Sequence, residues 1–249
     1  MYISLGNDIT SLSVSSDSNS SYTTDTLLTT SFSEVYLSNG SATNFDLEIT
    51  ITNPDYLAIT GNNIFDTCSS VEIAYWTGSA YTNEDTVTPE WNHTIVHKVQ
   101  NNATKYRFRF VKSDSTQVVS LAYVSAGSFY EIPNNGEQVG YSYAWTLPQT
   151  KQRTAMMDGS PTATILQDTS IQGSLSIAHH AIADVRTTWQ PFQKEALKNG
   201  FFIPEDESYP EEGYYCFDVK NQPSRAHGQT RQLKVSSISY SCWTGNNVS

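Results

Sequence analysis

The chain has 249 residues, a length that fits one large domain or two of ordinary size, and two is the better starting prediction. Lys and Arg number 14 and Asp and Glu number 25, so the formal net charge is −11, and only 16% of the residues are charged. Because phosphate contacts need clustered cations, this composition argues against nucleic-acid and anionic-membrane binding. Basic residues are unevenly distributed along the chain. Residues 1–130 carry 5 basic and 13 acidic side chains, and no Lys or Arg precedes Lys98.

Export, membrane insertion and zinc binding find no support in the sequence. The first residues lack both a basic segment and a long apolar run, so we expect no secretory signal. Apolar runs are far shorter than the ~18–20 residues that cross a bilayer, so we expect no membrane insertion. Cys68, Cys216 and Cys242 fit no zinc-binding spacing, which favours buried apolar thiols and leaves a Cys216–Cys242 disulfide as the alternative.

Short strands and turns are predicted for the first half of the chain. Residues 6–44 are rich in Ser, Thr, Asn and Asp with recurring apolar positions, which indicates short strands and ordered loops. Alternating or apolar runs follow at residues 45–51, 56–60, 71–76, 94–99, 105–111 and 118–124, separated by Asn, Gly and Pro. This succession without helical periodicity predicts an antiparallel β-sandwich over residues 1–128.

The second half combines strands with one helix. Strands are predicted at residues 129–133, 139–145, 174–178, 201–203, 214–219 and 233–240. A helix is predicted within residues 182–199, where one face is formed by Val185, Trp189, Phe192 and Ala196. Pro191 leaves two alternatives, a kinked continuous helix or a short turn followed by a helix that starts near residue 189. Residues 129–249 are therefore predicted to be α+β, and the whole chain mainly β.

No catalytic motif stands out. The sequence contains no nucleotide-binding glycine loop, no nucleophile elbow and no zinc-protease motif. His179 and His180 lie near Asp184, but neighbouring residues of a strand point to opposite faces, so at most one His would converge on Asp184. His97 is predicted to be a surface or core residue rather than a ligand. We therefore expect no enzymatic activity, no metal and no cofactor.

Two groups of side chains are candidates for binding. Aromatic faces with nearby amides suit a saccharide, and the sequence offers Trp76, Tyr81 and Trp91 with Asn62, Asn63, Asn92 and His93. Core packing is the alternative for Trp76, which ends a predicted strand. The second group is an acidic loop whose carboxylates include Glu205, Glu207 and Glu211; a solvated or interface loop is favoured over a hydrolytic carboxylate pair or a calcium site. If copies assemble head to tail, this loop would face Arg225 and Arg231 of a neighbour.

The order of the segments resembles a known family of viral proteins. The first half is similar to a discoidin, or galactose-binding-like, sandwich of jelly-roll type over residues 22–28, 33–38, 42–49, 56–63, 71–81, 105–110 and 121–127. The second half is similar to the companion region of the same proteins at residues 129–133, 153–159, 200–204 and 209–215. Together they resemble minor tail or distal tail (baseplate) proteins of long-tailed bacteriophages.

This resemblance implies a structural virion protein at the tail tip, made in the host cytoplasm. Such proteins form a ring of copies around the tail tube, for which a hexamer is one arrangement, and contact the tube and hub proteins. The sandwich would contact a host saccharide or only decorate the tail. The alternative is a carbohydrate-binding adhesion module without a role in tail assembly.

Overall fold

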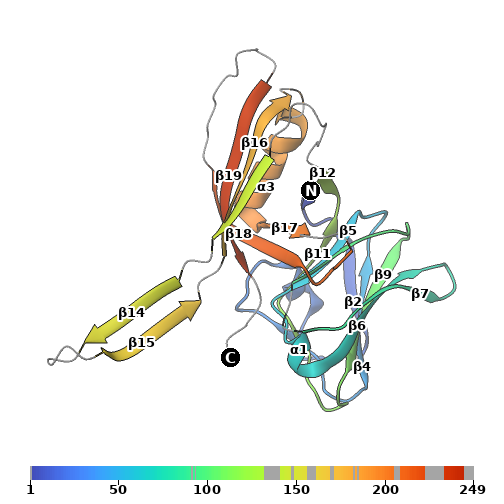
Figure 1. The fold of residues 1–249 in the computed structure, drawn as a ribbon. Helices are drawn as coiled ribbons and strands as arrows, with labels where there is room; N and C mark the ends of the chain where they lie inside the picture. Colours follow the sequence, from blue (N-terminus) through green and yellow to red (C-terminus); the bar gives the residue numbers. More distant parts are fainter. Residues whose placement is uncertain are drawn as a thin grey trace.

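The computed structural model describes residues 2–90, 92, 94–131, 141–146, 149–155, 161–168, 171–181, 183, 185–204, 208–221 and 233–243. Within these ranges every paired strand is antiparallel to its neighbour. A β-sandwich, a second sheet with the principal helix and a projecting two-stranded ribbon make up the molecule (Figure 1). The expected fold class, mainly β with a sandwich followed by an α+β region, is confirmed.

Five strands form the larger sheet of the sandwich. Across the sheet they are β2 (Ser11–Ser16), β4 (Asn44–Thr50), β9 (Lys105–Lys112), β6 (Cys68–Trp76) and β7 (Tyr81–Val87). On the central strand β9, the alternation seen in the sequence is observed, because Tyr106, Phe108 and Phe110 are fully buried and the residues between them are not. Strand β7 was not predicted; its residues are mostly polar, and it forms the sheet edge by pairing with β6.

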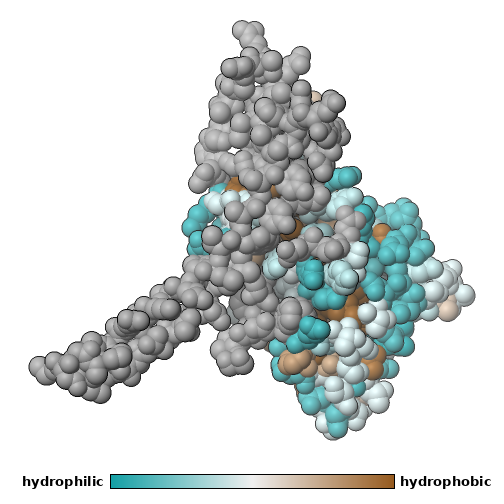
Figure 2. Space-filling view, viewed as in Figure 1, coloured by the Kyte–Doolittle hydropathy of each residue, from teal (hydrophilic) through white to brown (hydrophobic). Residues whose placement is uncertain are grey.

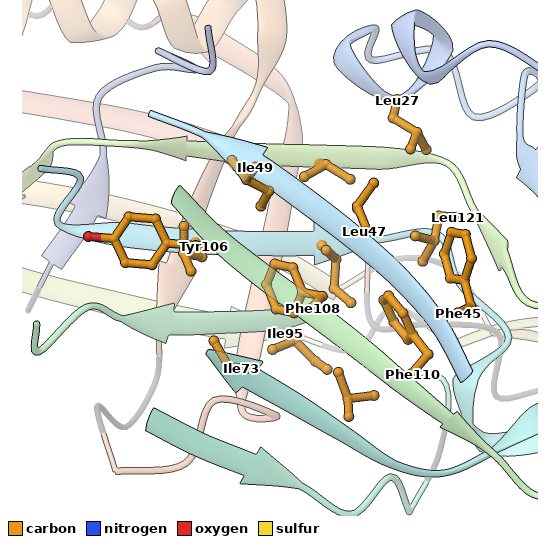
Figure 3. Packing of buried hydrophobic residues seen from close by; sticks show 14 of the residues in the cluster. Leu27, Phe45, Leu47, Ile49, Ile73, Ile95, Tyr106, Phe108, Phe110 and Leu121 are labelled. Carbon is orange, nitrogen blue, oxygen red and sulfur yellow. The ribbon is translucent and has the colours of Figure 1, made fainter. Parts of the chain in front are cut away.

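A three-stranded sheet packs against the five-stranded one. It consists of β11 (Tyr123–Gly127), β5 (Tyr56–Thr60) and β8 (Ile95–Lys98). The apolar side chains between the two sheets form a continuous core (Figure 3), which includes Leu47, Ile49, Ile73, Ile95 and Phe108. Every residue of β5 and of β11 is buried, so something covers the second face of this sheet as well.

The sandwich is completed by short elements at its margins. They are the 3-10 helix η1 (Thr24–Leu28), β3 (Tyr36–Leu37), β10 (Ser120–Leu121) and the one-turn helix α1 (Ile64–Thr67). Strand β3 pairs with β10, and Leu27 from η1 reaches the core.

The second large sheet comes from the C-terminal half. Its order is β13 (Tyr141–Thr146), β16 (Ile171–Ala181), β19 (Leu233–Trp243), β18 (Gly213–Asn221) and β17 (Phe201–Pro204). The principal helix α3 (Gln190–Asn199) packs against this sheet and follows directly on a π-helical turn, η2 (Val185–Trp189).

The helical segment combines the two alternatives left by Pro191. The α-helix starts at Gln190 and Pro191 lies in its first turn, where proline is well tolerated. The helix nevertheless continues directly from η2, and Trp189 at the junction is also helical. The predicted apolar face is confirmed, since Val185, Trp189, Phe192 and Ala196 are 5%, 1%, 1% and 2% exposed. These side chains form the core of the second sheet.

An aromatic cluster joins the sandwich to the C-terminal sheet. Tyr123 of β11 stacks on Phe202 of β17 with ring centroids 5.8 Å apart, and Tyr215 of β18 lies 5.0 Å from the Phe202 ring. The backbone N–H of Val96 donates to the carbonyl of Pro210 at 2.8 Å. The covered second face of the three-stranded sheet is therefore the contact between the two regions.

The first strand belongs to the C-terminal core rather than to the sandwich. Strand β1 (Tyr2–Ser4) pairs with β12 (Phe129–Glu131), and Ile3 is buried in the same cluster as Trp189. The hydroxyl of Ser4 accepts a hydrogen bond from the backbone N–H of Phe202 at 2.7 Å. The division into residues 1–128 and 129–249 stays a prediction.

Strands β14 (Gln149–Ala155) and β15 (Pro161–Asp168) form a separate two-stranded ribbon. Figure 1 shows the ribbon extending away from both sheets. It is inserted between β13 and β16, which pair with each other up to Thr146 and Gln172. Neither strand was expected from the sequence.

Candidate functional site

The outer face of the five-stranded sheet carries aromatic and charged side chains that meet one another. The strand register places Glu48 of β4 and Ala74 of β6 on either side of Arg107 of β9, and Trp76 opposite Tyr81. Ala74 is only 1% exposed. We call Asp46, Glu48, Trp76, Tyr81, Arg107 and Arg109 the outer-face cluster.

Charge pairing organises one side of this cluster. Arg109 donates from Nε and Nη2 to the two carboxylate oxygens of Asp46, both at 2.9 Å. Arg107 lies 3.7 Å from the same carboxylate through Nη1. One acidic side chain thus pairs with two cations on the central strand, and the fork-to-fork geometry fixes the orientation of Arg109.

The aromatic side of the cluster is built on Tyr81. The Arg107 guanidinium lies 4.4 Å from the centroid of the Tyr81 ring, and the Trp76 ring meets the same ring edge-on at 5.0 Å. Burial and the Glu48 carboxylate, which accepts a hydrogen bond from the phenol, raise the pKa of Tyr81 to about 12. The phenol therefore stays protonated and donates, and Trp76 remains half-buried beside it.

The predicted amide residues lie elsewhere, around α1. The side chain of Asn63 donates to the carbonyl of Val118 at 3.0 Å and accepts from the backbone N–H of Ser120 at 2.8 Å. Asn62 is 6% exposed and accepts from the backbone N–H of Ile64 at 3.3 Å. Asn63 thus holds the start of α1 to the segment leading into β10, and Asn62 stabilises the turn into α1. Both amides, which were expected to bind a saccharide, make structural contacts.

Asn92 has the same kind of role. It accepts from the backbone N–H of Phe65 at 2.9 Å and donates to the Asp66 carboxylate at 3.0 Å, so the Asn92 side chain packs against α1. Trp91 and His93 lie outside the described residues.

The structure does not bring Trp76 together with Asn62 and Asn63. Helix α1 leads directly into the first residue of β6, and Trp76 is the last residue of that nine-residue strand. At ~3.3 Å per residue, the two ends of β6 are about 26 Å apart. This separation could not be predicted from the spacing in the sequence, because it depends on the extended strand that runs between α1 and Trp76.

His97 is a core residue with two acidic partners that the sequence did not reveal. Its side chain is 2% exposed, with Nε2 at 2.9 Å from Glu84 and Nδ1 at 3.4 Å from Asp85. Burial by itself lowers the pKa of His97, but the hydrogen bonds to Asp85 and Glu84 outweigh it and raise the pKa above its usual value. The imidazolium thus links β7 of one sheet to β8 of the other.

Glu84 also organises the loop after β8. Its second oxygen accepts from the backbone N–H groups of Gln100 and Asn101 and from the Asn101 side chain, at 3.0, 2.7 and 2.9 Å. Burial raises the pKa of Glu84, but the hydrogen bonds from His97 and Asn101 outweigh it and lower the pKa. This network is saturated by internal partners and therefore has a structural role.

The predicted interface residues are only partly within the described residues. Glu205, Glu207, Arg225 and Arg231 lie outside them, and Glu211 is half-buried in the turn before β18. The neighbouring Pro210 accepts the hydrogen bond from Val96, so this part of the acidic loop rests on the sandwich of the same chain.

The described residues contain neither a metal-binding cluster nor a membrane-spanning helix. Among the described residues, no group of three or more His, Cys, Asp or Glu is arranged to hold a metal ion. The same residues include no helix long and apolar enough to cross a membrane. The side of the sandwich seen in Figure 2 is mainly hydrophilic, with its apolar residues in small patches.

No protein-family model matches this sequence, and no curated protein matches it. Solved structures do: a pectin-binding carbohydrate-binding module has a TM-score of 0.39 at 7% identity, covering 51% of this chain and 96% of its own. The CBM32-1 module of a family 31 glycoside hydrolase from Clostridium perfringens has a TM-score of 0.39 at 12% identity, over 49% of this chain and 98% of its own. A truncated AlyQ with CBM32 and alginate lyase domains has a TM-score of 0.41 at 13% identity, over 73% and 49%. At these identities the likeness concerns the fold alone.

Proposed function

We propose that the protein is a structural, non-catalytic component of the tail tip of a long-tailed bacteriophage, a distal tail or minor tail protein that assembles around the tail tube. Its partners would be other copies of the chain in a ring, the tail tube and the hub proteins. The observation that carries the assembly role is the β14–β15 ribbon, and the resemblance in segment order supports the viral setting.

The ribbon favours assembly because it is incomplete as a folding unit. Two strands alone are marginally stable in water, and a third strand or a packed face is normally needed. Strands β14 and β15 pair with each other, and neither belongs to a larger sheet within the described chain. Each therefore keeps a free edge of backbone donors and acceptors, which a strand of a neighbouring subunit can pair with.

The ribbon can be removed with the loss of one terminal pair, Ile171–Cys242, from the sheet that carries it. Because Thr146 pairs with Gln172, replacing residues 147–171 by Asn-Gly closes β13 and β16 into a two-residue hairpin. A matched control replaces only residues 156–160 by Asn-Gly, which joins the paired residues Ala155 and Pro161 and keeps both strands. Circular dichroism would verify that all three proteins fold.

Light scattering and negative-stain microscopy, with and without the tail-tube protein of the same genome, then measure assembly. We expect wild type and the control to form rings or to coat the tube, and the ribbon-less variant to stay monomeric. Assembly of the ribbon-less variant would show that the ribbon is not required for assembly. A wild type that is monomeric under all conditions would contradict the assembly proposal.

The viral setting has a separate test. Mass spectrometry of purified particles should find the chain in the virion, and its gene should lie between those for the tape-measure and tail-fibre proteins. A chain that is missing from the particles would contradict the tail-tip location while leaving self-assembly untouched.

A second candidate is saccharide binding by the outer-face cluster. The half-buried Trp76 next to a protonated Tyr81 and a paired guanidinium offers an aromatic surface flanked by polar groups. A glycan array should show binding by wild type, weaker binding by Trp76→Ala, and unchanged binding by Phe65→Ala, which removes an exposed aromatic ring at the far end of β6. A wild type that binds no glycan would end this candidate.

A further inference from the structure

Two cysteines face each other in the middle of the C-terminal sheet. Cys216 of β18 and Cys242 of β19 are direct partners in the strand register. Their sulfur atoms are 2.9 Å apart, and both side chains are 0% exposed. They lie 26 positions apart in the sequence, so folding alone brings them together.

The strand register at this point suits the Cα separation of a disulfide. Directly opposed residues of antiparallel strands have Cα atoms about 4.5 or 5.5 Å apart, depending on the hydrogen-bonding type of the pair. Both separations fall within the range of roughly 4.4–6.8 Å that disulfides span. No movement of β18 relative to β19 is needed for the bond to form.

We propose that Cys216 and Cys242 are an oxidation site of this protein and form a cross-strand disulfide that fastens β18 to β19. The two strands are internal in the sheet, flanked by β17 on one side and β16 on the other. A covalent link between them therefore holds the core against which α3 packs. This inference is independent of the proposed function.

The reaction can proceed by exchange with a small disulfide such as oxidised glutathione. One cysteine, as thiolate, attacks a glutathione sulfur, forms a mixed disulfide and releases one glutathione thiol. The second thiolate attacks the protein sulfur of the mixed disulfide and releases the second glutathione. Two protein thiols are oxidised to one disulfide, one glutathione disulfide is reduced to two thiols, and the two protons pass to the released thiolates.

Burial of the two cysteines limits their oxidation to states in which the sheet is open. Burial and the adjacent Cys242 raise the pKa of Cys216 well above its usual value, so the reactive thiolate is scarce in the folded sheet. Oxidation is therefore expected as the chain folds or when the sheet opens locally, and the finished bond is shielded from reducing agents. The third cysteine, Cys68, lies in the separate core of the sandwich with the hydroxyl of Thr67 3.5 Å away.

The test is to unfold the full chain, refold it with a mixture of reduced and oxidised glutathione, and alkylate the remaining thiols in denaturant. We expect intact mass to show the loss of two hydrogen atoms and a single alkylation, which peptide mapping places on Cys68. Three alkylated thiols, or a bond that includes Cys68, would overturn the proposal.

Variants separate the bond from general effects of refolding. Cys68→Ser should still lose two hydrogen atoms, whereas Cys242→Ser should lose none and carry two alkylated thiols. If Cys242→Ser does not fold, the peptide map of wild type decides by itself. The oxidised protein should unfold at a midpoint roughly 5–10 °C above the reduced one, because the link restricts the unfolded chain; an unchanged midpoint would contradict the fastening role.

Discussion

The sandwich and the C-terminal sheet differ in what their interiors contain. The sandwich buries ionised groups: the side chains of Asp17 and Lys112 are both 0% exposed and pair with each other, and His97 lies between two carboxylates. The described core of the C-terminal sheet is made of aromatic, aliphatic and cysteine side chains. We therefore expect the stability of the first region to depend on charge state and pH as well as on packing, and that of the second mainly on packing.

Most of the few cations of the first region lie on one strand, and three of them pair with buried carboxylates. Of the five in residues 1–130, four lie on the central strand β9. Lys112 neutralises buried Asp17, and both arginines of β9 contact Asp46. A chain with a large acidic excess thus keeps its few cations in the middle of a sheet.

The largest expected effect comes from cutting a cavity into either core. Phe108→Ala in the sandwich and Trp189→Ala under α3 should each lower the free energy of unfolding by about 3–5 kcal/mol, because both side chains are fully packed. Urea unfolding followed by fluorescence and circular dichroism measures this.

Unfolding of these two variants also tests whether the sandwich and the C-terminal region unfold in one cooperative transition. Since the aromatic cluster of Tyr123, Phe202 and Tyr215 joins them, we expect both variants to shift one common transition. Two transitions, each moved by only one variant, would contradict this coupling. Leu197→Ala, at a position of α3 that is 46% exposed, is the control and should change stability by less than about 0.5 kcal/mol.

Removing one member of the buried ion pair is expected to cost about 3 kcal/mol. Burial raises the pKa of Asp17, but hydrogen bonds from Lys112 and from the backbone N–H groups of Ser41 and Gly40 lower it to about 2. Lys112→Met leaves that charge buried without its cation. The double variant Asp17→Asn with Lys112→Met should recover part of the loss; equal stability of the two variants in urea would contradict the assignment.

A pH dependence of stability should arise from titratable groups of the sandwich. The raised pKa of His97 means that its stabilisation is complete below its ordinary value of 6.5 and is lost as pH rises through the folded-state pKa. The pKa values of Glu84 and Asp85 are lowered from their ordinary values of 4.5 and 3.8. Their contributions to stability are therefore complete above those pH values and are lost as the pH falls through the folded-state pKa values. Stability from this network is therefore greatest between about pH 5 and 6.5.

His97→Gln removes this dependence. At pH 5.5 it should cost about 1–3 kcal/mol, the value of hydrogen bonds to charged groups, and the difference from wild type should shrink by pH 9. Thermal unfolding at both pH values measures it. A difference that grows with pH would show that the neutral imidazole is the stabilising form.

The smallest effect is expected on the outer face. Arg109→Lys keeps the charge but loses the two-point contact with Asp46, at a side chain that is 31% exposed, so a loss below about 1 kcal/mol is expected. Urea unfolding in low and high salt would check it. A larger loss would mean that this pair matters as much as the buried one.

Sequence patterns predicted elements wherever burial follows a regular period. The alternation in β9 and the apolar face of the segment from Val185 to Ala196 both appear as expected, since one face of each is buried. Strands β7, β14 and β15 were missed, because their sequences are mostly polar or mixed and show no regular apolar period; they form by pairing with a neighbouring strand.

The candidate site was predictable only in its aromatic half. Trp76 and Tyr81 were recognised by residue type, and the structure places their rings in contact. Arg107 and Glu48 were not, because their part in the cluster depends on which strands are neighbours. Asn62 and Asn63 were expected beside Trp76, but the length of β6 separates them.

Local periodicity and composition are enough to predict the mainly β class, the position and buried face of the helix, and the acidic, cation-poor character of the first region. The folded chain was needed to see that β1 packs into the C-terminal core, that Lys112 reaches Asp17 and that Cys216 meets Cys242. Those contacts join residues that are far apart in the chain, and strand order and register, which no local pattern encodes, bring them together.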